Sequence, residues 1–336
     1  MKHLTRLAAP ALAAALALPA GAATFGMNEI ALSLGDEGQE LRVLAGTGAG
    51  TSVALKDASG KTVRIDDIDF RPSTGGLYGY SNQTNTVYLI DRMTGLSTAV
   101  ATATNITGSG DLGFDFNNKI DAARVVTDGP GKRNDNVVFF PENFTPGSAA
   151  TLTAFTGLAY AAGDVNAGKD PAVEMNAYTN ALPKADLDAA GVGVTQFVID
   201  HSRNTLATLA NNTGILTTIG TLFHEGAALD ISGDGGFDIL SLMPNMNTAY
   251  ALLTSGKGTA FNQSIYSFGL TADASGRINL SLVSDVTQGP GLSDRLDGFA
   301  VFTAPAAVPL PASVLLLGAA IGGLGLAARR RNRKDA

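Results

Sequence analysis

The feature that most constrains the fold of this chain is the length of its apolar runs. Between its two ends the chain is rich in Gly, Thr, Ser, Asn and Ala, and its apolar residues come in short groups bounded by turn residues. Short apolar runs separated by turn residues are typical of β-strands, and long helix formers are scarce. The sequence therefore predicts an all-β fold.

Two hairpins follow one another directly in residues 68–100. Residues 68–80 form a strand, a turn with Pro72, Gly75 and Gly76, and a second strand. Residues 86–100 repeat this order around Thr94 and Gly95. Pro and Gly supply the backbone angles that tight turns require. Four consecutive strands of this kind make one blade of a β-propeller.

Echoes of these hairpins recur along the chain as internal repeats. They lie at residues 113–116 with 123–126, 195–200 with 205–209, 236–239 with 248–252, 265–268 and 296–302. The spacing is irregular, because Asp69 and Asp115 are 46 residues apart whereas Asp115 and Asp238 are 123 apart. The sequence predicts a ring of four-stranded blades, with five blades preferred and six left open.

The last repeat has a single strand, whereas residues 29–34 and 41–44 near the start are strands without a hairpin partner. A ring can be closed by completing the last blade with these N-terminal strands, which removes exposed sheet edges. We therefore predict closure of the ring by the N-terminal strands.

The body of the chain resembles the family of exported bacterial proteins known as domain of unknown function 4394. The matching stretches are residues 68–79, 113–116 with 124–126, 177–180, 236–239 with 247–250, and 296–301. The resemblance implies a propeller-like repeat domain over residues 24–303. It implies no activity, because the family has none assigned.

The first 23 residues have the order of a secretory signal peptide. Lys2 and Arg6 precede an apolar run from Leu7 to Leu18, and small residues follow. Cleavage by signal peptidase is expected after Ala22 or Ala23. The alternative, an uncleaved membrane helix, is disfavoured because about 20 apolar residues are needed to span a bilayer.

The last 33 residues combine a Pro/Ala linker (304–312), an apolar segment (313–328) and a basic tail (329–336). Residues 309–328 are long enough to cross the inner membrane once as a helix of about 30 Å. The membrane stop consists of Arg329, Arg330, Arg331, Arg333 and Lys334. Basic flanks stay cytoplasmic, so the body is expected on the outer side. A buried core helix is the disfavoured alternative.

The linker ends in Val308, Pro309, Leu310, Pro311 and Ala312. Together with the apolar segment and the Arg cluster, this motif resembles the exosortase sorting signals of Gram-negative bacteria. The resemblance implies an exosortase-like transpeptidase as a partner, which would cut near the motif. The protein would then pass from a membrane-anchored form to the cell surface or the extracellular space.

Charge and cysteine content limit the possible partners of the body. It carries 16 of the 23 Lys and Arg residues but 29 of the 30 Asp and Glu residues, a net charge of about −13. Nucleic acid is excluded, because its phosphates require basic side chains. The chain has no cysteine, so it has neither disulfides nor thiolate metal sites. A glycan or matrix ligand remains as a partner.

The sequence offers no catalytic motif. His201 and His224 are the two histidines of the body, and neither has the spacing of a known catalytic or zinc pattern. Four aspartates recur in the repeats: Asp69, Asp115, Asp238 and Asp297. Paired carboxylates can serve glycoside cleavage, but a residue that recurs in each repeat is better explained as a turn cap that accepts backbone N–H bonds.

One acidic segment has the spacing of a calcium loop. Asp230, Ser232, Asp234 and Asp238 occupy positions 1, 3, 5 and 9, and Gly235 occupies position 6. Position 12 is Ser241 rather than Glu. We keep two interpretations open, a loose Ca²⁺ turn between strands and a polar loop without metal. No other cofactor is expected.

Two functions remain compatible with the sequence. The preferred one is a non-catalytic protein with a binding or structural role at the Gram-negative cell surface or in the extracellular matrix. The alternative is a hydrolase or lyase that acts on polysaccharide from a propeller scaffold.

Overall fold

The computed structural model describes residues 24–26, 28–46, 48–103, 112–127, 136–141, 150–257, 260–286 and 295–303. The chain divides into two compact units, Met1–Phe302 and Thr303–Ala336. The signal peptide, the sorting motif, the apolar segment and the basic tail all lie outside the described residues, so their predictions stay untested. Within the described residues, no helix is long and apolar enough to cross a membrane.

The prediction of an all-β fold is confirmed. Strands are the main element of the described residues, which also contain one short α-helix and one 3-10 turn. The elements are β1 Glu29–Gly35, β2 Glu40–Ala45, β3 Ser52–Ala54, β4 Asp67–Arg71, β5 Gly76–Ser81, β6 Thr86–Ile90, β7 Ser97–Thr102, β8 Leu112–Asn117, β9 Ala122–Thr127, β10 Asn136–Phe140, β11 Thr151–Ala154, β12 Ala159–Tyr160, β13 Val173–Tyr178, α1 Lys184–Ala190, β14 Gln196–Asp200, β15 Thr205–Ala210, η1 Asn211–Thr213, β16 Ile215–His224, β17 Ala227–Ala228, β18 Ile231–Met243, β19 Met246–Lys257, β20 Ala260–Phe268, β21 Arg277–Asp285 and β22 Asp297–Thr303.

The strands assemble into three four-stranded sheets and one ten-stranded sheet. The four-stranded sheets have the orders β22-β1-β2-β3, β4-β5-β6-β7 and β8-β9-β10-β11. The ten-stranded sheet runs β13-β14-β15-β16-β21-β20-β19-β18, and β12 and β17 pair with β16. It consists of two antiparallel groups of four, which are joined because β16 and β21 pair in parallel from Thr221 and Arg277 onward.

The predicted hairpins are present. In β4–β5 Phe70 lies opposite Leu77, and in β6–β7 Ile90 lies opposite Ser97. Gly75 and Gly95 have positive φ angles of 68° and 74°, which explains why glycine stands at both turns.

The N-terminal strands complete the last sheet, as predicted. β22 lies beside β1 although the two strands are at opposite ends of the described chain. Ser33 in β1 donates its hydroxyl hydrogen bond to the main chain of β22, 2.7 Å from the Gly298 oxygen. Ala31, Leu32 and Leu34 are fully buried in β1. The two ends of the fold therefore share one sheet and one core.

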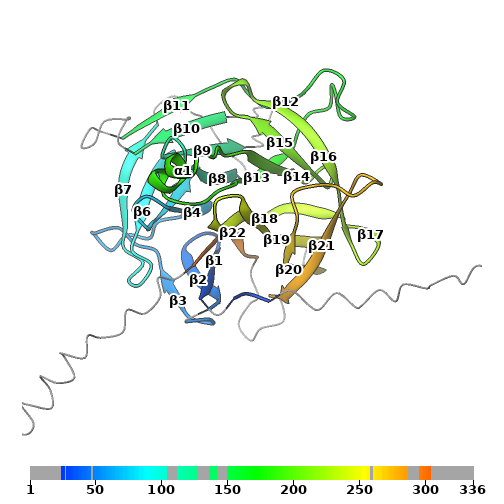
Figure 1. Cartoon of the computed structure of the whole chain (residues 1–336). Coiled ribbons are helices and arrows are strands. Elements are labelled where there is room, and N and C mark those ends of the chain that lie inside the picture. Colours follow the sequence, from blue (N-terminus) through cyan, green and yellow to red (C-terminus); the bar gives the residue numbers. More distant parts are fainter. Residues whose placement is uncertain are drawn as a thin grey trace, which may run out of the picture. The chain divides into compact units, whose positions relative to one another are not determined.

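One edge strand of each four-stranded group lies toward the middle of the unit (Figure 1). These strands are β4, β8, β13, β18 and β22. We call these the inner strands. β8 contacts β4 and β13, and β13 contacts β18. The outer strands of the groups, such as β3, β7 and β11, lie farther from this middle (Figure 1).

The helix α1 lies in the connection between β13 and β14. Pro183 precedes it, Ala and Leu are good helix formers, and Gly191 ends it with φ 65°. Leu187 is buried, and Lys184 pairs with Asp188 one turn away. The helix thus anchors a connection that the repeat pattern did not define.

Candidate functional site

Three inner strands each place an aspartate carboxylate against the backbone of the next inner strand. Successive side chains along a strand point to opposite sides. The aspartate can therefore point at the backbone of the adjacent inner strand while the residues before and after it in the sequence enter the core. The bonds join Asp69 to the N–H of Phe116 (2.8 Å), Asp115 to the N–H of Tyr178 (2.9 Å) and Asp238 to the N–H of Val301 (2.6 Å). These carboxylates therefore connect separate sheets.

Asp67 connects one inner strand to two others. Its carboxylate accepts the N–H of Phe114 in β8 at 2.6 Å and the N–H of Phe299 in β22 at 3.2 Å. Both bonds are buried. β4 is thus joined through side-chain oxygens to the inner strand on each side.

The glycine that precedes Phe-Asp in two repeats has a separate role. A Cβ on Gly236 would lie 2.5 Å from the backbone nitrogen of Phe299, and a Cβ on Gly113 would lie 2.7 Å from that of Asn176. Both distances are too short for any side chain. The recurring Gly-Phe-Asp sequence therefore lets two strands approach closely and supplies the carboxylate that joins them.

Asp69, Asp115 and Asp238 converge, and we call them the central aspartate cluster. One carboxylate oxygen from each lies within 4.8 Å of the others. All three residues are buried, with at most 7% of their surface exposed. They come from three different inner strands, so the cluster exists only when the sheets are assembled.

Burial raises the pKa of every carboxyl in this region. For Asp238 burial raises the pKa to about 7. Burial, together with the charge of Asp238, holds the pKa of Asp69 well above its usual range. Burial and the charges of Asp69 and Asp238 do the same for Asp115. The pKa of Asp67 is also raised by burial.

Two chemistries suit such a cluster. Carboxyls this close can share protons, because three adjacent negative charges repel one another. Alternatively, oxygens within 4.8 Å of one another are close enough to bind one Ca²⁺ ion, whose ligand distances are about 2.3–2.6 Å. Asp69, Asp115 and Asp238 are the described residues that could hold a cation in this way.

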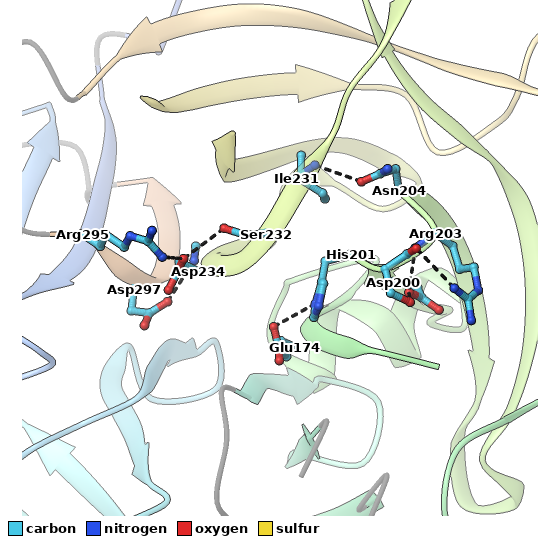
Figure 2. Close-up of polar contacts among 12 residues, drawn as sticks. Glu174, Asp200, His201, Arg203, Asn204, Ile231, Ser232, Asp234, Arg295 and Asp297 are labelled. Carbon is cyan, nitrogen blue, oxygen red and sulfur yellow. Dashed lines mark hydrogen bonds and ion pairs between the residues drawn. The ribbon is translucent and has the colours of Figure 1, made fainter. Parts of the chain in front are cut away.

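A second polar group lies where the inner strands begin (Figure 2). Glu174 in β13 faces His201, with 2.9 Å between Oε2 and Nδ1. Asp234 in β18 accepts the Ser232 hydroxyl at 3.0 Å and forms an ion pair with Arg295. Asp297, which starts β22, accepts the N–H of Gly235 at 2.9 Å. We call this group the polar mouth.

Residues 41–287 match the family described as Domain of unknown function (DUF4394). The chain belongs to this family. The match covers most of the body and includes the central aspartate cluster, but ends before β22. A comparison with curated proteins gives no match.

Solved structures give distant matches to this DUF4394 chain. A nidogen/laminin complex matches at 11% identity and TM-score 0.40, over 81% of this chain and 98% of that one. An auxiliary nutrient binding protein from Bacteroides ovatus matches at 16% and 0.36, over 80% and 54%. A putative 6-phosphogluconolactonase from Bacteroides uniformis matches at 15% and 0.36, over 78% and 84%. Similarity this low carries no functional argument.

The predicted calcium loop of this DUF4394 chain is not a loop. Residues 231–243 form the long strand β18, so Ser232, Asp234 and Asp238 are spread along it and Asp230 precedes it. Asp230 is exposed, Ser232 and Asp234 bond to each other in the polar mouth, and Asp238 belongs to the central cluster. Among the residues with described positions, the only group spaced to hold a metal is the central cluster. The four residues therefore lie in different surroundings.

The recurring aspartates behave partly as predicted. They accept backbone N–H bonds, which was the preferred interpretation. The donors, however, belong to neighbouring inner strands instead of turns, because Asp69, Asp115 and Asp238 lie within strands. Asp297 bonds to Gly235 and stands apart from the other three.

The two histidines lie apart in the fold. His201 follows β14 and faces the buried Glu174. His224 ends β16, where its Nδ1 lies 3.1 Å from the Leu280 oxygen and its ring packs edge-on against Tyr266. Each has a structural partner.

Sequence reasoning missed Asp67 and Glu174. Asp67 precedes Asp69 by two residues, and this spacing could have indicated that both point the same way from one strand. Glu174 gave no such signal, because it lies in a repeat that lacks the Gly-Phe-Asp sequence.

Proposed function

We propose that this chain is a non-catalytic protein, displayed on the surface of a Gram-negative cell or released into its matrix, whose body is a five-bladed β-propeller. Five four-stranded groups with neighbouring inner strands support the propeller. The two ends of the sequence support export and anchoring.

The observation that carries the non-catalytic proposal is the use of the central carboxylates. Asp67, Asp69, Asp115 and Asp238 are buried and accept backbone N–H bonds from neighbouring strands. A glycosidase needs carboxyls that reach the sugar, about 5–9.5 Å apart across it. Carboxyls that join strands and exclude solvent support a scaffold whose binding role lies elsewhere, on loops or at the polar mouth.

Binding without turnover is the expected result when the chain meets polysaccharide. The chain without its signal peptide is applied to a glycan array and incubated with a panel of bacterial polysaccharides. We expect retention on a subset of glycans and no new reducing ends or unsaturated products. Release of products that Asp115→Asn abolishes would instead establish the hydrolase or lyase alternative.

The sorting motif gives a prediction about the fate of the protein. Prolines disfavour helix and keep a segment extended, so a membrane enzyme can reach the backbone there. Replacing Pro309 and Pro311 with Ala should trap the full-length chain in the inner membrane. Fractionation with mass spectrometry of the C-terminus measures this.

Pro305→Ala is the matched control, because it removes a proline from the same linker outside the motif. It should leave processing unchanged. A wild-type protein that still ends at Ala336 in cells with the sorting enzyme would reduce the segment to an ordinary anchor.

A further inference from the structure

The inner strands run in parallel, and this gives the propeller unit two distinct faces. Asp67 and Asp69 in β4 bond to Phe114 and Phe116 in β8, so both strands advance in the same direction. Asp297 and Val301 in β22 bond to Gly235 and Asp238 in β18 in the same order. We call the face at which the inner strands end the exit face, since the chain leaves the unit there after β22.

Exposed apolar side chains gather at the turns of the exit face. Antiparallel neighbours place on this face the turns β4–β5, β6–β7, β8–β9, β15–β16, β18–β19 and β20–β21, together with the β13–β14 connection that carries the polar helix α1. Met93, Leu96, Ile120, Leu242, Met243 and Met246 lie in or beside these turns and are exposed. Leu89 and Ile215 lie next to the same turns. Among the exposed large apolar side chains of the described residues, Val165 alone lies neither in nor beside these turns.

Two of these turns flank the point where the chain leaves the unit. Phe302 packs on Phe70 with 3.9 Å between ring centroids, and the Arg92 guanidinium lies 5.5 Å over the Phe302 ring. Met93 follows Arg92 and is 73% exposed. The turn that carries Met93 is therefore adjacent to the end of β22.

The β18–β19 hairpin extends beyond the end of β22. Val301 is level with Asp238, so Thr303 is level with about Leu240. Met243 follows three residues later, about 10 Å farther along the strand. Leu242, Met243 and Met246 thus project past the exit point, where they have no core to enter.

The distance from the exit point to the predicted membrane anchor is short. Only residues 304–308 separate Thr303 from Pro309, and the six residue steps between the two span at most about 22 Å when extended. A bilayer at Pro309 therefore lies within reach of a hairpin that projects about 10 Å from the same face. Apolar side chains at this depth enter the headgroup region of a bilayer.

We infer that the exit face rests on a lipid bilayer and inserts the apolar β18–β19 tip, with Met93 and Leu96 beside it. This inference depends on the proposed C-terminal anchor. It orients the polar mouth away from the membrane. Isolated apolar turns are common on soluble proteins, but a set confined to one face, beside the tether, fits a membrane surface.

The test uses the full chain, which has no natural cysteine to interfere with labelling. Met243→Cys carries an environment-sensitive fluorophore, and the protein is reconstituted into vesicles of phosphatidylethanolamine and phosphatidylglycerol. Val165→Cys is the matched control, because Val165 is 83% exposed but belongs to the connection before β13. We expect a blue-shifted emission and severalfold weaker quenching by iodide for the Met243→Cys label alone.

Three other outcomes would contradict either the anchor or the docking of the exit face on lipid. Vesicles that float without the protein would refute the anchor and, with it, the docking inference. Floated protein whose two labels are equally quenched would refute docking and leave the anchor intact. A blue shift that depends on protein concentration and not on lipid would assign the face to a second copy of the chain.

Discussion

Removal of β1 and most of β2 is expected to unfold the whole β-sheet unit instead of fraying one edge. A chain that begins at Ala45 in place of Thr24 lacks Leu32, Leu34 and Leu41, which are at most 1% exposed. Each buried leucine side chain contributes about 2–5 kcal/mol. Three such losses are comparable to the entire stability of a domain, about 5–15 kcal/mol.

The loss of stability should extend to the other sheets because β1 holds β22 in place. β22 donates the N–H of Val301 to Asp238 and the N–H of Phe299 to Asp67. If β22 detaches, two buried carboxylates lose hydrogen bonds, and an unsatisfied buried polar group costs about 1–3 kcal/mol or more. Thermal unfolding followed by circular dichroism, together with hydrogen exchange in β4 and β18, measures the spread.

Leu34→Ala keeps this prediction testable if the shortened chain does not accumulate. We expect a loss of about 2–5 kcal/mol in a single transition. Leu89→Ala is the control, since Leu89 is 39% exposed and should change stability little. An unchanged melting temperature of the shortened chain, or loss of protection in β22 alone, would contradict closure by the N-terminal strands.

Local patterns predicted most of the strands, because the residue types at the turns mark where the strands end. Gly75 and Gly95 fix the ends of two hairpins by their positive φ angles, and the pairing of residues on either side follows. The lone closing strand and the spare N-terminal strands predicted their shared sheet. These features depend on a few neighbouring residues.

The irregular repeat spacing has a specific cause. Tyr178 bonds to Asp115 just as Phe116 bonds to Asp69, so Ala177 stands where β4, β8 and β18 have aspartate. The inner strand β13 therefore lacks the residue that marks these three strands. The parallel pairing of β16 with β21 joins two groups into one sheet, and no local residue pattern in the sequence indicates it.

The central cluster could not be derived from the sequence because it depends on assembly. Asp69, Asp115 and Asp238 are far apart along the chain and meet only when three inner strands lie side by side. The loop expected around residues 230–238 is instead a strand, and its glycines are also explained by assembly. Gly233, Gly235 and Gly236 suggest a loop, but Gly236 is required for the close approach of Phe299.

The domain is expected to lose stability as pH rises from about 4 through about 7, when EDTA is present to remove cations. A carboxyl with a raised pKa in the folded state binds its proton more tightly there than in the unfolded chain, where the pKa is about 3.9. The carboxyl contributes its full extra stability to the folded state at pH values below the unfolded pKa. This contribution is lost as the pH rises through the folded pKa. For Asp238, with a pKa of about 7, the change is on the order of 4 kcal/mol.

Asp115→Asn should flatten this profile. The amide oxygen can still accept the N–H of Tyr178, whereas the negative charge beside Asp69 and Asp238 is removed. Without that charge the remaining two carboxyls ionise at lower pH, so stability at pH 8 should increase relative to wild type. Urea unfolding at a series of pH values measures the difference.

Asp273→Asn is the control for the pH series. Asp273 is an exposed turn cap whose pKa is lowered, by its hydrogen bond to Asn279 foremost. A lowered pKa contributes its stability above the unfolded value and loses it only as pH falls, so this group acts below pH 4. The slope between pH 4 and 8 should be the same in Asp273→Asn as in wild type.

The same series separates proton sharing from cation binding in the cluster. A cation that binds only the folded state raises stability by RT ln(1 + [L]/Kd), so calcium at pH 8 would restore what ionisation removes. Asp115→Asn would weaken that restoration, whereas Asp234→Ala would not, because Asp234 pairs with Arg295 outside the cluster. A wild-type profile that is flat from pH 4 to 8 in EDTA would contradict the raised pKa values. If calcium stabilises Asp115→Asn at pH 8 but does not stabilise Asp234→Ala, the calcium site lies at Asp234 on β18 and not in the central cluster.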